Sequence, residues 1–221
     1  MKRIQEFFHK YRHMWLLSYA FIYLPWFCHL EKTVTRGYHV MHATLDDYIP
    51  FCEYFIIPYL LWFLYVSATL IFFLFVSRED YYRMCIFLFS GMTISLIVCT
   101  FFHNGTDFRP VINPDKNIFS AMVASLYKTD TCTNVFPSIH VYNSIGTHIA
   151  IMRSEILKKH SLVRAGSRIL MISICLATVF LKQHSVLDVV GAIIMAYVMY
   201  MVVYGYSWSA QDKSVTEKVL W

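Results

Sequence analysis

The sequence predicts an all-α polytopic membrane protein, a helical bundle of about six transmembrane helices that forms one domain over residues 1–221. Composition is the first reason. Of the 221 residues, 57% are hydrophobic and only 15% are charged, whereas soluble domains carry about 25% charged residues. The second reason is that apolar runs recur along the chain and the charges gather at their ends. A membrane-spanning helix needs about 20 such residues. No internal repeat or second domain is visible.

The apolar runs define six expected spans. The first follows a basic tail and is interpreted as an uncleaved anchor, because no small-residue cleavage site comes after it. The fourth is less hydrophobic than the others, and the fourth and fifth are short. In chain order the expected spans are residues 14–30, 54–76, 82–102, 137–152, 167–181 and 186–206.

Basic residues set the orientation of the bundle, because cytoplasmic loops carry an excess of Lys and Arg. With six spans, thirteen of these residues fall on the side of the two termini and six on the other side. Both termini are therefore expected in the cytoplasm of a multi-pass cell-membrane protein. Loops 31–53 and 103–136 and the turn 182–185 should face outward. The basic residues form no single patch, so no nucleic-acid partner is expected.

Cysteine and histidine spacings indicate neither a metal site nor a cofactor. The six cysteines contain no CxxC pair. Three of them lie near the expected outer face, where a disulfide stays an open alternative: Cys28, Cys52 and Cys132. One loop cluster resembles a metal site in composition but is interpreted as solvated: His39, His42, Asp46 and Asp47.

Three polar clusters fall on the expected outer side, all within residues 103–190. The first is FRP, which contains Arg109. The second is PSIH, residues 137–140, at the start of the fourth span. The third is KQHSVLD, residues 182–188, at the start of the sixth. Their convergence on one side predicts a shared site.

The PSIH cluster has the features of an anion site that can also move a proton. Pro137 suits the first helical turn, where an N–H would have no partner. The free amides of Ser138, Ile139 and His140 would then point toward an anion such as phosphate. The Ser138 hydroxyl adds a donor, and His140 projects from the first turn toward the same place.

The third cluster predicts an oriented nucleophile. His184 and Asp188 are spaced i, i+4, which places them on one face of a helix. A carboxylate that accepts from one imidazole nitrogen fixes the tautomer and leaves the other nitrogen free to attack. Arg109 and Lys182 would supply positive charge for a phosphoryl group. Elsewhere, His148 is expected to make a helix–helix hydrogen bond rather than to relay protons.

The order R-P, P-S-x-H and H-x-x-x-D within six membrane spans resembles the type 2 phosphatidic acid phosphatase superfamily, over about residues 50–206. The resemblance implies metal-independent chemistry through a phosphohistidine, with His184 as nucleophile and Asp188 as its orienting partner. It also implies that His140 protonates the leaving group and then activates the acceptor. Arg109, Ser138 and the amides of the fourth helix would hold the phosphate.

Two positions depart from the pattern of the superfamily. A Lys precedes the motif arginine by seven residues in the family, and Phe102 stands there in this chain. An Arg precedes the nucleophile by six residues in the family, and Thr178 stands there. Lys182 is the candidate replacement for the lost charge. Shortened motifs of this kind resemble the branch of inositol phosphorylceramide and sphingomyelin synthases, which pass a phosphoryl headgroup to an alcohol.

The sequence therefore predicts an integral-membrane lipid phosphate phosphatase that acts on the extracytoplasmic side. A lipid headgroup phosphotransferase that uses an alcohol acceptor is the first alternative, and a non-catalytic lipid transporter is the second. The partners would be the lipid bilayer and a membrane lipid phosphate. Chain type, headgroup, acceptor and oligomeric state stay open.

Overall fold

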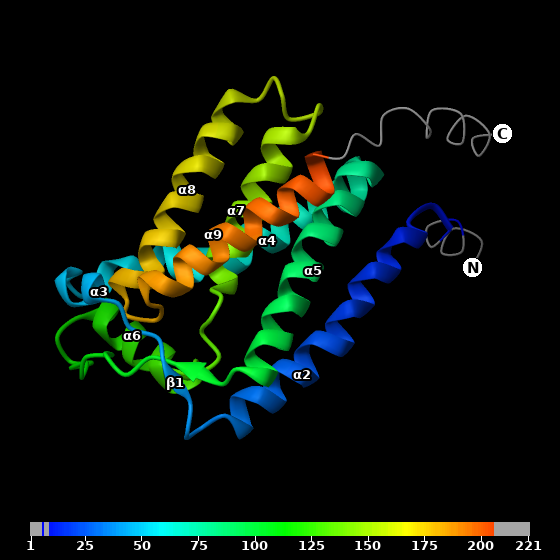
Figure 1. Ribbon diagram of the computed structural model, residues 1–221. Helices are drawn as coiled ribbons and strands as arrows, with labels where there is room; N and C mark the ends of the chain where they lie inside the picture. Colours follow the sequence, from blue (N-terminus) through cyan, green and yellow to red (C-terminus); the bar gives the residue numbers. More distant parts are fainter. Residues whose placement is uncertain (1–5, 7–8, 206–221) are drawn as a thin grey trace.

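The structure is a computed structural model that describes residue 6 and residues 9–205, and it is a helical bundle (Figure 1). Two-residue strands β1 (His39–Val40) and β2 (Asn104–Gly105) are its only strands within the described part of the chain. The helices, in chain order, are η1 (Arg12–Tyr19), α2 (Ala20–Thr33), α3 (Thr44–Tyr48), η2 (Glu53–Phe55), α4 (Ile56–Val76), α5 (Arg78–Phe101), α6 (Ile118–Thr129), α7 (Ile139–Arg153), α8 (Ser161–Phe180), α9 (Val186–Tyr200) and the π-helical η3 (Met201–Gly205).

Within the described residues, four helical stretches are long and apolar enough to cross a membrane. They correspond to the second, third, fifth and sixth expected spans: Glu53–Val76, Arg78–Phe101, Ser161–Phe180 and Val186–Gly205. The first expected span folds as η1 followed by a 14-residue α2, and the fourth folds as the 15-residue α7. Neither α-helix reaches the length of about 20 residues that a span needs. The total of about six therefore stays a prediction.

Helix boundaries follow local chemistry. The second and third spans are separated by Ser77 alone, whose hydroxyl accepts from the Asp80 N–H at 3.2 Å and so caps α5. The fifth span begins at Ser161 rather than Ser167, so the helix also includes Arg164. Long cationic side chains can extend from a helix end toward the headgroups. The predicted end of the sixth span at residue 206 and the basic residues of both tails (2, 3, 213 and 218) lie outside the described residues.

The short helix α7 occupies the centre of the bundle, where it packs against α4, α5, α8 and α9. The Tyr142 ring stacks on Phe87 with 4.9 Å between centroids, and its hydroxyl donates to the Phe87 carbonyl at 2.8 Å. A Cβ atom at Gly91 would come within 2.1 Å of the Tyr142 ring. Glycine is therefore needed there for α5 and α7 to approach closely, as is common between membrane helices.

Connecting segments form a cap over the end of the bundle at which α7 and α9 begin. Strands β1 and β2 pair in parallel, with His39 opposite Asn104. The Thr106 N–H donates to the Cys132 carbonyl, and the Asn134 N–H donates to the Asn104 carbonyl, each at 2.8 Å. In Figure 1, β1, α3 and α6 lie together at this end. The cap thus brings three separate loops to the site of the sequence motifs.

Candidate active site

The starts of α7 and α9 meet at the capped end of the bundle. Each start is capped by a serine: Ser138 accepts from the Val141 N–H at 3.4 Å, and Ser185 accepts from the Leu187 N–H at 3.1 Å. The Ser138 N–H donates to the carbonyl of Asp188 at 3.2 Å. Two motifs that lie far apart in the sequence are therefore neighbours in space.

His184 and Asp188 form a buried pair. Nδ1 of His184 lies 3.3 Å from Oδ2 of Asp188, and the same oxygen accepts from the Ser185 N–H at 2.9 Å. Asp188 has no exposed surface, and its Oδ1 has no partner among the described residues. An Nδ1–H donated to this carboxylate leaves the lone pair of Nε2 available for attack. The distance between Nδ1 and Oδ2 is slightly longer than that of a usual hydrogen bond. Catalytic hydrogen bonds are often long before substrate binds.

One part of the expected anion site is wrong. The Ser138 amide is not free, because it donates to the Asp188 carbonyl. Ser138 is also fully buried. The Ser138 N–H instead joins the start of α7 to the start of α9. The PSIH motif alone does not reveal this long-range contact. Phosphate binding by the amides of Ile139 and His140 stays a prediction.

His140 stands in an aromatic recess and faces His184. Its ring centroid lies 4.5 Å from that of Tyr59 and 4.4 Å from that of Trp62, both on α4. The His184 ring centroid is 5.7 Å away. No hydrogen bond joins the His140 ring to another residue in the described part of the chain. The recess therefore fixes the plane of the ring by packing and leaves its nitrogens for a ligand.

Backbone carbonyls hold the Arg109 guanidinium in place. Its guanidinium donates to the carbonyls of Asp130 at 2.8 Å and Thr131 at 2.7 Å. It lies 4.8 Å above the centre of the Tyr127 ring, a cation–π contact. It also donates to the side-chain oxygen of Gln183, the residue before His184. Arg109 is thus placed next to the nucleophile candidate through Gln183.

Lys182 is differently engaged. Its ammonium donates to the carbonyls of Asp46 at 2.6 Å and Ile49 at 2.5 Å, so its charge holds the segment that contains α3. Its backbone has a positive φ of 53°, uncommon for a residue with a side chain. The carbonyl of Thr178 accepts from the amides of Gln183 and His184 at 3.0 and 3.1 Å. A phosphate-binding role for Lys182 stays a prediction, without a contact that supports it in this arrangement.

Sequence reasoning missed Asp46, which it placed in a solvated loop. Asp46 is buried, and its carboxylate accepts from the Ser185 hydroxyl at 2.5 Å, the Val186 N–H at 2.8 Å and the Ala43 N–H at 2.8 Å. A carboxylate at the first turn of a helix is also favoured by the helix dipole. Asp46 therefore fixes the start of α9 beside His184. Its one short-range contact is with the Ala43 N–H, and an alanine there carries no capping signal that the sequence could have revealed.

The neighbouring residues match the expected solvated loop. His42 and Asp47 are exposed and joined by a 2.8 Å hydrogen bond, and this contact raises the pKa of His42 above its usual value. No group of three or more His, Cys, Asp or Glu side chains in the described residues could hold a metal ion. All six cysteines are free, so the disulfide alternative at the outer face is not supported.

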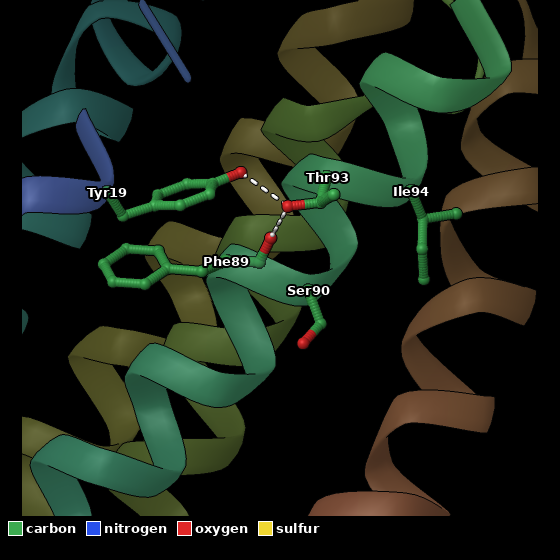
Figure 2. A pocket seen from close by; sticks show the side chains of 5 residues that line it. All are labelled: Tyr19, Phe89, Ser90, Thr93 and Ile94. Carbon is green, nitrogen blue, oxygen red and sulfur yellow. Dashed lines mark hydrogen bonds between the residues drawn. The ribbon is translucent and has the colours of Figure 1, made fainter. Parts of the chain in front are cut away.

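A hollow on the side of the bundle lies apart from the motifs (Figure 2). Tyr19 forms one wall, with its ring stacked on Phe89 and its hydroxyl 2.8 Å from Oγ1 of Thr93. Ser90 and Ile94 of α5 complete the lining. None of the motif residues contributes to this hollow, so we do not assign the candidate chemistry to it.

The arrangement at the capped end can support phosphoryl transfer. It combines an imidazole paired with a carboxylate, a second imidazole that faces the first, and a guanidinium that contacts Gln183, the residue before the first imidazole. These are the kinds of group that a nucleophile, a proton carrier and a fixed positive charge require. No protein-family model, no curated protein and no solved structure matches this chain.

Proposed function

We propose that this chain is a membrane-embedded lipid phosphate phosphatase that works without a metal through a phosphohistidine. The observation that carries the proposal is the pairing of His184 with Asp188 at 3.3 Å, with the His140 ring opposite at 5.7 Å between centroids. The motif order and its resemblance to the type 2 phosphatidic acid phosphatases support the same chemistry.

In the first half-reaction, Nε2 of His184 attacks phosphorus and a phosphorus–nitrogen bond forms. The bond between phosphorus and the lipid oxygen breaks, and His140 gives a proton to that oxygen. Arg109 offsets the charge on the phosphoryl oxygens. In the second half, His140 takes a proton from water as the water oxygen attacks phosphorus, and the phosphorus–nitrogen bond to His184 breaks. Inorganic phosphate leaves and both histidines return to their first state.

The active site is proposed to open on the extracytoplasmic side of the cell membrane, with both termini in the cytoplasm. The excess of Lys and Arg on the side of the termini supports this orientation. The loops that form the cap belong to the side with six such residues. The substrate would then be a lipid phosphate of the outer leaflet.

Headgroup transfer to an alcohol is the second candidate, and the small number of cations at the site favours it. Phe102 and Thr178 replace two cations of the superfamily pattern, and the Lys182 ammonium binds carbonyls of another loop. A phosphate monoester carries about −1.5 to −2 charge at pH 7, whereas a diester carries a single charge. A site with one fixed guanidinium is better matched to the diester.

One experiment tests the shared chemistry. Purified protein in excess EDTA is mixed briefly with lipids labelled at phosphorus, with and without an alcohol acceptor, and quenched in alkali, where phosphohistidine survives and acyl phosphate does not. We expect an alkali-stable label on the wild type and none on His184→Ala, whose turnover should be lost. Free phosphate indicates hydrolysis and a new lipid indicates transfer.

Two results would count against the proposal. Near wild-type turnover by His184→Ala would exclude the phosphohistidine. Activity that EDTA abolishes and a divalent ion restores would contradict the metal-free reaction. Absence of any label or product from all lipids would favour the non-catalytic lipid transporter instead.

A further inference from the structure

Gln183 lies between the two groups assigned to phosphate chemistry. It is only 2% exposed, it directly precedes His184 in the chain, and its side chain contacts Arg109. The turn after α8 fixes this position, because the amides of Gln183 and His184 both donate to the Thr178 carbonyl. One backbone carbonyl therefore holds both Gln183 and the nucleophile candidate.

Chemistry settles the orientation of the Gln183 amide. Arginine carries only donors, so the group that faces Arg109 must be the amide oxygen, Oε1. The NH2 group, Nε2, then points away from Arg109. It is buried and has no acceptor among the described residues. The Nε of Arg109 is likewise buried without a partner.

Native structures rarely leave a buried donor unpaired, so each such group calls for an explanation. The two unpaired donors belong to residues in direct contact, and both require an acceptor. An anion with several oxygens satisfies donors of this kind, and charge-assisted bonds from arginine favour it further. A phosphoryl group transferred to His184 is the anion that the neighbouring chemistry supplies.

We propose that Gln183 is a phosphate-binding residue whose neutral amide donates to the phosphoryl group beside Arg109. This inference rests on the proposed phosphoryl transfer. It assigns to Gln183 the role that was expected of Lys182, whose ammonium binds the carbonyls of Asp46 and Ile49 in this arrangement. A water molecule that merely fills the space is the opposing explanation.

The test compares binding of orthovanadate, a phosphate-shaped oxyanion, by isothermal titration of the purified full chain. Gln183→Met removes the amide at similar length. Gln183→Glu keeps an acceptor for Arg109 but removes the donor and adds a negative charge. The matched control is Lys128→Gln, which changes the net charge by the same amount as Gln183→Glu at an exposed residue of α6. Thermal unfolding of each variant checks the fold.

We expect Gln183→Met to raise the Kd about 10- to 100-fold, the usual effect of losing a hydrogen bond to a charged group. Gln183→Glu should weaken binding at least as much, and Lys128→Gln should bind as the wild type does. If Gln183→Met binds vanadate with the wild-type Kd, the amide does not bind phosphate and the inference is overturned. If Gln183→Glu does so, the amide serves only to hold Arg109, and the inference is again overturned.

Failure of this inference can be told from failure of the proposed function. An alkali-stable label on the wild type, together with vanadate binding that does not depend on Gln183, would refute the inference alone. A wild type that neither acquires the label nor binds vanadate would refute both. A folded Gln183→Met protein that is labelled only at higher substrate concentration would support both.

Discussion

His140 and His148 lie on the same helix, two turns apart, in opposite surroundings. His148 is tied to α8, because its Nδ1 lies 2.9 Å from the Ser167 hydroxyl, which in turn lies 2.6 Å from the Tyr65 hydroxyl. This confirms the expected helix–helix hydrogen bond. His140 has ring contacts with Tyr59, Trp62 and His184 but no hydrogen bond to the described residues.

The comparison teaches that the position of a histidine on the helix decides whether its ring nitrogens are taken up by a neighbouring helix or left free. Inside the bundle an imidazole without partners would be costly, so a neighbouring helix supplies a hydroxyl. At the capped end, aromatic rings hold the plane of the imidazole without occupying its nitrogens. The second environment is the one that suits a group that must gain and lose a proton.

The largest effect that separates the two histidines is expected in breakdown of the phosphohistidine. His140→Ala should slow that step by about 10²–10⁴-fold, the usual contribution of a positioned acid–base group. Formation of the label should be spared when the leaving group is already good. The measurement is the decay of the alkali-stable label after a chase with unlabelled lipid.

His148→Leu is the matched control. It removes the hydrogen bond to Ser167, which costs about 1 kcal/mol of stability, so the unfolding midpoint should fall while the decay of the label keeps its wild-type rate. Equal slowing of decay in both variants would erase the distinction between the two histidines.

A smaller effect is expected at Asp46, which we assign as a positioning residue for His184. Asp46→Ala leaves the Ser185 hydroxyl and the Val186 N–H without their partner. Loss of correct position at a reacting group can cost about 100-fold in rate, so kcat should fall by up to this factor while KM changes little. The measurement is the steady-state rate across substrate concentrations.

Asp47→Ala serves as the control. Asp47 is exposed, and among the described residues its side chain is hydrogen-bonded only to His42. Its kinetics should match the wild type. Asp46→Asn keeps the shape of the side chain and should recover part of the rate. If Asp46→Ala retains full kcat in a folded protein, Asp46 does not position the nucleophile.

The last prediction concerns the side of the membrane that the candidate active site faces. It is tested by labelling and not by a reaction rate. Lys116 is exposed and pairs with Glu53 at 2.6 Å at the capped end of the bundle. In a background without the native cysteines, Lys116→Cys should react with an impermeant thiol reagent in intact cells, and His160→Cys should not. The reverse pattern would turn the candidate active site toward the cytoplasm.

Composition and local spacing determined the features that depend on neighbours along the chain. Long apolar runs made four helices of spanning length, since a backbone in lipid must satisfy its own hydrogen bonds. The short spacing brought His184 near Asp188, but not on one helix face as expected: His184 precedes α9, and the Asp188 carboxylate in the first turn reaches back to it and to the Ser185 N–H. Where an apolar run was short and polar, as at α7, the sequence indicated a helix but could not establish a span.

Tertiary structure alone decided which distant groups complete the site. Asp46 and Ser185 are separated by 139 residues, and no periodicity relates a loop carboxylate to the start of a helix so far along the chain. The same holds for Arg109 with Gln183 and for Tyr59 with His140. Lys182, expected to face phosphate, binds two carbonyls because the fold brings that loop within reach of its ammonium. Such contacts depend on how the helices pack and on which loop covers their ends, and local spacing contains neither.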